Sequence, residues 1–203
     1  MPPDATATKA RILEAALREF AQHGLAGARV DRIAESAAAN KRSLYVHFGN
    51  KDELFDLVVA KALADMAAEV PFTADDLPGY AVRLFDHLRT HPHVLRLTTW
   101  AQLERPEPSP AEIEAYRPKV AAVAEAQAAG GITSPSDAVD LLALTIATAT
   151  AWANASPALR SLAPDPPGSA QRLDRHRAAL TRAQSAIVSS GHGGARAAAP
   201  AAD

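Results

Sequence analysis

The fold is decided by residues 30–54, which read VDRIAESAAANKRSLYVHFGNKDEL. Apolar side chains recur there at helical spacing, and asparagines that can cap a helix precede two of the periodic runs. The pattern predicts helices over residues 30–37 and 41–48 and from Lys51 to Glu69. The third of these helices is expected to turn Leu54, Leu57, Val58 and Leu63 inward. Two short helices joined by a turn of about four residues have the plan of a helix-turn-helix.

The second short helix is predicted to have an apolar and a polar face. Leu44 and Phe48 fall together on a helical wheel and should face the core, whereas Arg42 and Val46 point the other way. Residues 29–51 carry five basic side chains against two acidic ones, a local charge of +3 in a chain whose net charge is -2. A local basic surface beside a helix-turn-helix favours a DNA-binding role.

The motifs of this segment resemble the amino-terminal domain of TetR-family repressors. The resemblance covers residues 9–55, and the spacing Leu-Tyr-x-His-Phe-x-x-Lys-x-x-Leu is more specific than a generic helix-turn-helix. It is carried by Val30-Asp31-Arg32-Ile33-Ala34-Glu35, by Asn40-Lys41-Arg42-Ser43-Leu44-Tyr45-Val46-His47-Phe48 and by Asn50-Lys51-Asp52-Glu53-Leu54.

The resemblance implies roles for individual side chains. Lys41, Arg42 and Ser43 would lie against base edges or nearby backbone, while Tyr45, His47 and Lys51 would contact phosphates. An arginine can bond guanine at two atoms, and a helix amino terminus favours an anion. The full set expected at DNA is Arg29, Asn40, Lys41, Arg42, Ser43, Tyr45, His47 and Lys51.

Three residues depart from the family pattern. Ala38 stands where the family usually has glycine, so it either adopts a left-handed conformation at some cost or the turn differs slightly. Arg29 replaces the usual serine or threonine cap. Arg42 replaces a small residue, and it either extends base readout or reaches the DNA backbone.

The rest of the chain predicts an all-α fold in two domains. The three-helix DNA-binding domain occupies residues 9–50 and a larger ligand-binding and dimerisation domain occupies 51–190, while 1–8 and 191–203 are expected to be disordered. The first helix should span Lys9–His23, between a Thr8 cap and a Gly24 stop. Later helices are expected over Leu77–Thr90, Pro92–Glu104, Pro110–Ala129, Ser136–Ala155 and Ser169–Ser190, with a proline-rich loop over Ser156–Gly168.

The larger domain offers apolar and hydroxyl side chains for a partly apolar small-molecule effector, although core packing would use the same residues. The candidate lining is Met66, Phe85, Leu88, Trp100, Leu103, Tyr116, Thr148 and Trp152.

The last two helices are the candidates for a homodimer interface, by analogy with the family. Intramolecular burial would use their apolar faces equally well. These faces are Leu141, Leu142, Ile146, Ala149 and Ala153, and Leu173, Leu180, Ala183, Ile187 and Val188.

Several classes of protein are disfavoured. The chain has no cysteine, no secretory signal pattern and no run of about eighteen apolar residues, so we expect a cytoplasmic protein without membrane insertion. His87, His91 and His93 resemble a metal cluster, but Pro92 interrupts them and no carboxylate completes a set. No catalytic or phosphate-binding motif is present, so neither an enzyme nor a cofactor is expected.

The sequence therefore predicts a homodimeric regulator that reads an inverted repeat in double-stranded operator DNA, with recognition helices roughly 34 to 36 Å apart. A ligand would release it from the operator, or as a corepressor strengthen binding. Two alternatives remain: a ligand-independent regulator or activator whose second domain only dimerises, and a small-molecule enzyme with a vestigial DNA-binding domain.

Overall fold

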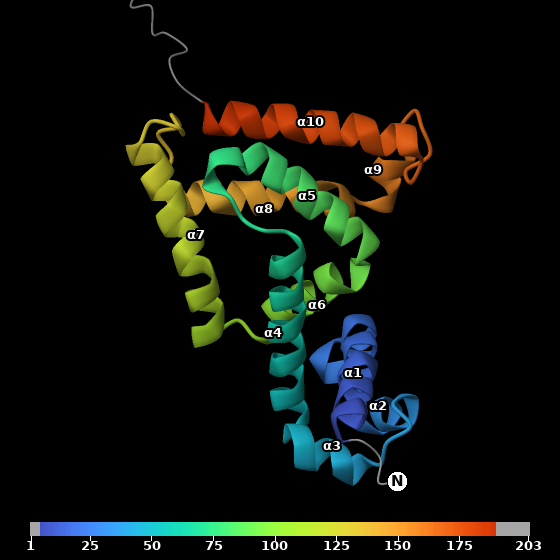
Figure 1. Ribbon diagram of the computed structural model, residues 1–203. Coiled ribbons are helices and arrows are strands. Elements are labelled where there is room, and N and C mark those ends of the chain that lie inside the picture. The colour runs from blue at the N-terminus through green and yellow to red at the C-terminus, as the bar shows by residue number, and fades with distance from the viewer. Residues whose placement is uncertain (1–4, 190–203) are drawn as a thin grey trace, which may run out of the picture. The chain divides into compact units, whose positions relative to one another are not determined.

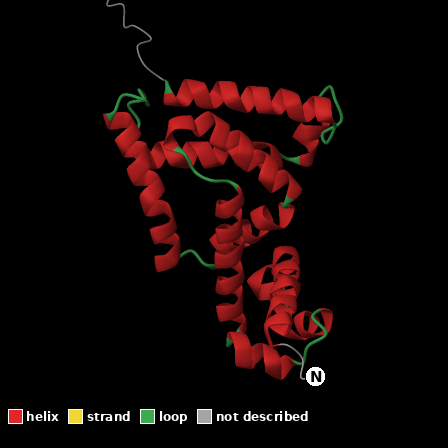
Figure 2. Ribbon diagram, in the orientation of Figure 1, coloured by secondary structure: helices red, strands yellow, loops and turns green. Residues whose placement is uncertain are grey.

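The computed structural model describes residues 5–189, which form helices and no strand (Figures 1 and 2). The predicted all-α fold is confirmed. The helices are α1 (Ala5–Gly27), α2 (Val30–Ser36), α3 (Lys41–Phe48), α4 (Lys51–Glu69), α5 (Leu77–Thr90), α6 (Pro92–Glu104), α7 (Pro110–Ala128), α8 (Ala138–Asn154), α9 (Pro157–Ser161) and α10 (Ala170–Val188), with a 3-10 turn, η1, at Ala74–Asp76.

Two local expectations are wrong. Thr8 is not an N-cap, because α1 already begins at Ala5 and the alanines and threonines there continue the helix. The expected disorder of residues 1–8 stays a prediction. The segment expected as a loop contains α9, since the Ser156 hydroxyl accepts the Leu159 N–H at 3.1 Å and a proline occupies the first turn. Residues 1–4 and the expected tail 191–203 lie outside the described residues.

The contacts between residues divide the chain into two compact units. The first comprises the described residues of 1–71 and 86–116, and the second those of 72–85 and 117–203. The first unit extends past the expected boundary at residue 50 because α4 and α6 both pack with α1. The functional division at residue 50 stays a prediction.

The core of the first unit joins α1 to α4. The Phe20 and Phe55 rings are fully buried and meet edge to face, with centroids 5.1 Å apart. Leu54 and Val58 are buried as predicted, but Leu57, also expected inside, is 44% exposed. The inward stripe of α4 includes Phe55 instead, since the bulky ring packs against α1.

The helix α6 packs against a sharp bend near the end of α1. Gly24, predicted to stop the helix, has φ +68° and interrupts it, and helical structure resumes to Gly27. A Cβ at Gly24 would lie 2.8 Å from the Trp100 ring of α6. Beyond the bend, the Glu104 carboxylate accepts the Leu25 N–H and, at 3.0 Å, the Ala26 N–H.

The second unit is built around the part of α5 up to Phe85, the part of α7 from Arg117, and the helices α8 and α10. Leu77, Val123 and Leu141 are buried in its core, and the rings of Phe72 and Tyr80 meet at 5.0 Å. A buried polar contact joins α8 to α10, where the Gln184 carbonyl accepts the Thr145 hydroxyl at 3.2 Å.

The helix faces predicted to dimerise are largely used inside this unit. Five of the ten side chains are buried, namely Leu141, Leu142, Ala149, Leu173 and Leu180. Ile187 and Val188 pack against the core, whereas Ala153 and Ala183 are exposed. A different stripe of α8 faces solvent in the chain, comprising Val139, Ala143, Leu144, Ala147 and Ala151.

Candidate nucleic-acid interface

The turn between α2 and α3 is held by hydrogen bonds from both sides. Asn40 caps α3, its side-chain oxygen accepting the Ser43 N–H at 2.6 Å. The Arg11 guanidinium of α1 donates to the Ala37 carbonyl at 3.0 Å. Between them Ala38 has φ +48°, the left-handed conformation expected where the family has glycine. These contacts fix the direction in which α3 leaves the turn.

α3 presents the predicted faces. Leu44 is fully buried and Phe48 packs against the same core. Arg42 and Tyr45 are exposed, and Val46 is 70% exposed. The helix therefore offers a guanidinium, a phenol and an apolar side chain outward from a rigid base, the combination that base edges and phosphates can bind.

The start of α4 lies beside the helix-turn-helix. Asn50 and Glu53 form a reciprocal capping box, in which each side chain accepts the other's backbone N–H. The half-buried Lys51 donates from Nζ to the Ala28 carbonyl at 3.3 Å. Lys51 thereby ties α4 to the segment between α1 and α2, and its predicted contact with phosphate stays a prediction.

Ion pairs reduce the free basic charge of the segment. Arg32 binds Glu19 of α1, and Lys41 Nζ lies 2.9 Å from Asp31. Hydrogen bonding to Asp31 raises the pKa of Lys41. Within residues 5–189 the exposed side chains of Arg29 and Arg42 form no ion pair, so they are available to an anionic partner.

Glu19 is a supporting residue that the sequence reading missed. Besides Arg32 it accepts the backbone N–H of Arg29 at 2.8 Å, at the start of α2. Burial alone would raise the pKa of Glu19, but the hydrogen bonds from Arg32 and Arg29 outweigh it and hold that pKa below its ordinary value. No local motif marks Glu19 or Arg11, because both act on residues distant in the sequence.

All eight residues expected at DNA lie in the first unit. Arg29, Asn40, Lys41, Arg42 and Tyr45 are exposed, and Ser43, His47 and Lys51 are half-buried. They belong to the start of α2, to α3 with its cap and to the first turn of α4.

The residues expected to line a ligand pocket are divided between the units. Met66, Leu88, Trp100, Leu103 and Tyr116 belong to the first and Phe85, Thr148 and Trp152 to the second. Phe85 and Leu88 are buried, Trp100 packs against the core of α1, and Leu103 is exposed. Thr148 bonds Gln184, and Trp152 lies under the Arg172 guanidinium, 5.2 Å from the ring centroid. Their role toward a ligand stays a prediction.

The sequence-based argument against a metal site assumed that no carboxylate lies near His87 and His91, and that assumption is wrong. His87 and His91 do have a carboxylate neighbour, because Glu69 at the end of α4 completes a group of three potential metal ligands. Only folding brings this residue to the histidines.

Among the described residues, no helix combines the length and apolar character that crossing a membrane requires.

Comparisons with protein families agree with this geometry. Residues 12–58 match the family described as bacterial regulatory proteins, tetR family. Residues 76–185 match a family described as tetracyclin repressor-like, C-terminal domain. The two matches together span the helix-turn-helix and most of the remaining helices.

Individual relatives and solved structures point the same way. The HTH-type transcriptional repressor SCO4008 of Streptomyces coelicolor is 47% identical over 163 residues, 78% of this chain and 84% of the relative. The HTH-type transcriptional repressor AcnR of Corynebacterium glutamicum is 42% identical over 65 residues, covering 32% of this chain and 34% of the relative. The crystal structure of the putative transcriptional regulator SCO4942 from Streptomyces coelicolor superimposes with a TM-score of 0.76 at 37% identity, over 87% of this chain and 96% of that one.

Proposed function

Because the chain belongs to the TetR family of bacterial regulatory proteins and is a DNA-binding transcriptional regulator, we propose that it is a repressor released from a palindromic operator by a small molecule. The observation that carries the proposal is α3, whose Arg42 and Tyr45 face outward from a capped and buried base. Family membership points away from an enzyme, and a cytoplasmic location fits a protein that acts on the bacterial chromosome.

Each exposed side chain of the interface has a role in this proposal. Arg42 contacts a base edge or the adjacent DNA backbone. Lys41 leaves its ion pair with Asp31 and binds DNA instead. Tyr45, His47 and Lys51 contact phosphates, and Arg29 extends the basic surface at the start of α2. Ser43 contacts a base edge or the adjacent backbone, and Asn40 contributes through the cap that orients the amino end of α3.

We assign dimerisation to α8 and α10. The exposed stripe of α8, in which Val139 and Leu144 flank small alanines, is an apolar face that a second copy would bury. A two-fold dimer sets two copies of α3 roughly 34 to 36 Å apart, which suits an inverted repeat.

We assign the effector site to the larger helical domain, residues 51–190. The effector expected there is a partly apolar small molecule. It lowers operator affinity by favouring a conformer whose recognition helices no longer match the half-site spacing. Operator affinity measured with and without a bound effector shows whether the ligand weakens or strengthens DNA binding. A higher affinity with the ligand would make it a corepressor. An unchanged affinity would leave a regulator whose second domain only dimerises.

The test of DNA binding uses the full-length protein and DNA from upstream of its own gene, titrated across salt by fluorescence anisotropy. Tight, sequence-selective binding should weaken as salt rises. Arg42→Ala and Tyr45→Ala should each lower affinity roughly tenfold, a loss of about 1.4 kcal/mol. The matched control is Arg89→Ala, an exposed arginine on α5, which should bind normally.

Two results would overturn the assignment of the interface. The first is equal affinity of wild type, Arg42→Ala and Tyr45→Ala for the selected DNA. The second is failure to bind any sequence in a wider selection from random DNA, which would favour the enzyme with a vestigial DNA-binding domain.

A further inference from the structure

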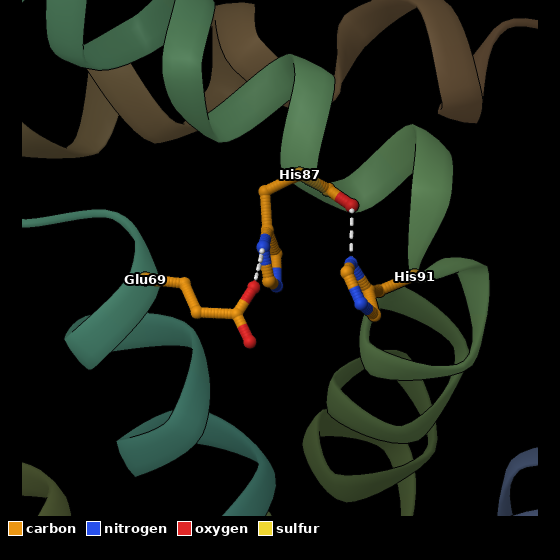
Figure 3. A group of neighbouring side chains, drawn as sticks. All are labelled: Glu69, His87 and His91. Carbon is orange, nitrogen blue, oxygen red and sulfur yellow. Dashed lines mark hydrogen bonds and ion pairs between the residues drawn. The ribbon is translucent and has the colours of Figure 1, made fainter.

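Three potential metal ligands converge in the first unit where α4 and α5 end. Figure 3 shows Glu69 reaching from the last turn of α4 toward His87 of α5, with the ring of His91 facing that of His87. One ligand atom from each residue lies within 4.8 Å of the other two. The group is therefore compact enough to bind one ion after small side-chain rotations.

The separation of Glu69 and His87 suits shared coordination. Glu69 Oε2 lies 3.3 Å from His87 Nδ1. Two ligands bound to one tetrahedral zinc ion at about 2.0 to 2.1 Å are roughly 3.3 Å apart. The side chain of His87 is 8% exposed and that of Glu69 is 60% exposed, so one ligand is rigidly held and another can adjust from the solvent side.

His91 has the orientation of a prepared ligand. Its Nδ1 lies 3.1 Å from the His87 carbonyl oxygen, which can only accept a hydrogen bond. In the tautomer that donates from Nδ1 to this carbonyl, Nε2 has a free lone pair that can bind a metal ion. A backbone carbonyl that fixes the tautomer in this way is the usual support of a histidine bound to a metal.

The two imidazole rings lie face to face. The His87 and His91 rings stack with centroids 4.2 Å apart and planes inclined by 19°. One nitrogen of each ring therefore lies close to a Glu69 carboxylate oxygen, within the 4.8 Å that joins the three ligand atoms.

We propose that Glu69, His87 and His91 form a binding site for a first-row divalent metal ion such as Zn²⁺. Two imidazoles and one carboxylate are a donor set that such ions accept, and three protein ligands leave coordination room for water or a small molecule. Its ligands come from the last turn of α4, from the final turns of α5 and from the residue that follows α5.

The test uses tag-free, full-length protein stripped of metal with EDTA and titrated with Zn²⁺ against a chromophoric chelator. We expect about one Zn²⁺ per chain, and Co²⁺ should give the intense visible absorption of a low-symmetry site. Glu69→Gln, His87→Gln and His91→Gln should each weaken Zn²⁺ binding roughly tenfold or more. Because Glu69 is exposed, its variant tests the site without disturbing the core.

His93→Gln is the matched control, since the His93 ring lies beside His91, with centroids 5.8 Å apart, but outside the group of three. It should retain wild-type affinity and the Co²⁺ spectrum. Absence of stoichiometric binding by the wild type would reduce the group to a histidine stack with a Glu69 ion pair and overturn the proposal. Equal affinity in Glu69→Gln and wild type, or an equal loss in His93→Gln, would overturn the assigned ligand set.

Discussion

Ala38 shows how one residue can carry a measurable cost at a functional turn. It is the only residue other than glycine with positive φ among residues 5–189, and its side chain is exposed. The left-handed conformation costs an L-residue roughly 1 to 2 kcal/mol, whereas glycine adopts it freely but loses more entropy on folding. The strain lies between the Arg11 contact at Ala37 and the cap at Asn40, which together hold the turn.

We therefore predict that Ala38→Gly raises the free energy of unfolding by up to about 1 kcal/mol. Urea denaturation followed by circular dichroism would measure it. Ala39→Gly is the control: its backbone does not have positive φ, so glycine would only add entropy to the unfolded chain and should destabilise the protein. Equal destabilisation by both substitutions would contradict the strain at Ala38.

Gly24 and Gly27 form a second matched pair of positions. Gly24 has φ +68° and no space for a Cβ beside Trp100, whereas a Cβ at Gly27 meets only His23 at an ordinary 3.4 Å. Gly24→Ala should cost at least about 1 to 2 kcal/mol of stability and lower the melting temperature. Gly27→Ala should be neutral or slightly stabilising, since alanine favours helix. Equal melting temperatures for the two variants would contradict the requirement for glycine at the bend.

At the scale of elements, Glu19 determines how α2 is attached to α1. Its carboxylate bonds the Arg32 side chain and the Arg29 N–H, with little exposure to solvent. Since hydrogen bonds to charged groups contribute roughly 1.5 to 3 kcal/mol, Glu19→Gln should lower stability by about that amount at neutral pH. Glu35→Gln, an exposed change on α2, should have little effect.

The same contact has a defined pH dependence. The pKa of Glu19 is lowered in the folded state, so its contribution is fully present above the ordinary glutamate pKa and is lost as pH falls through the folded value. The stability difference between wild type and Glu19→Gln should therefore shrink in acid. Denaturation curves at neutral and acidic pH would measure this, and a difference that grows in acid would contradict the assignment.

At the scale of the whole molecule, the proposed operator binding depends on the proposed pairing of two copies of the chain. Leu144→Glu places a charge on the exposed stripe of α8 without entering the core of its own chain. We predict a folded monomer with operator affinity reduced at least roughly tenfold, because one half-site then carries the binding. Sedimentation and anisotropy would measure the two effects. Thr181→Glu, an exposed change on α10, tests how far the interface extends. A Leu144→Glu protein that stays dimeric would remove this stripe from the interface.

The sequence alone determined the helical fold, the helix-turn-helix and the family, because those signals are local. Helical spacing places Leu44 inward and Arg42 outward whatever the rest of the chain does, and Asn40 and Asn50 cap helices through residues three positions away. The conformation of Ala38 could also be anticipated, since the turn itself requires it.

Only the tertiary structure decided which side chains from distant segments meet. Glu19 neutralises Arg32, Glu104 caps the bend of α1, and Glu69 joins His87 and His91. None of these partners has a fixed spacing in the sequence, because each contact depends on how two helices pack. For the same reason the exposed position of Leu57 and the stripe of α8 that remains for a partner could not be read from periodicity, which finds apolar faces but not what covers them.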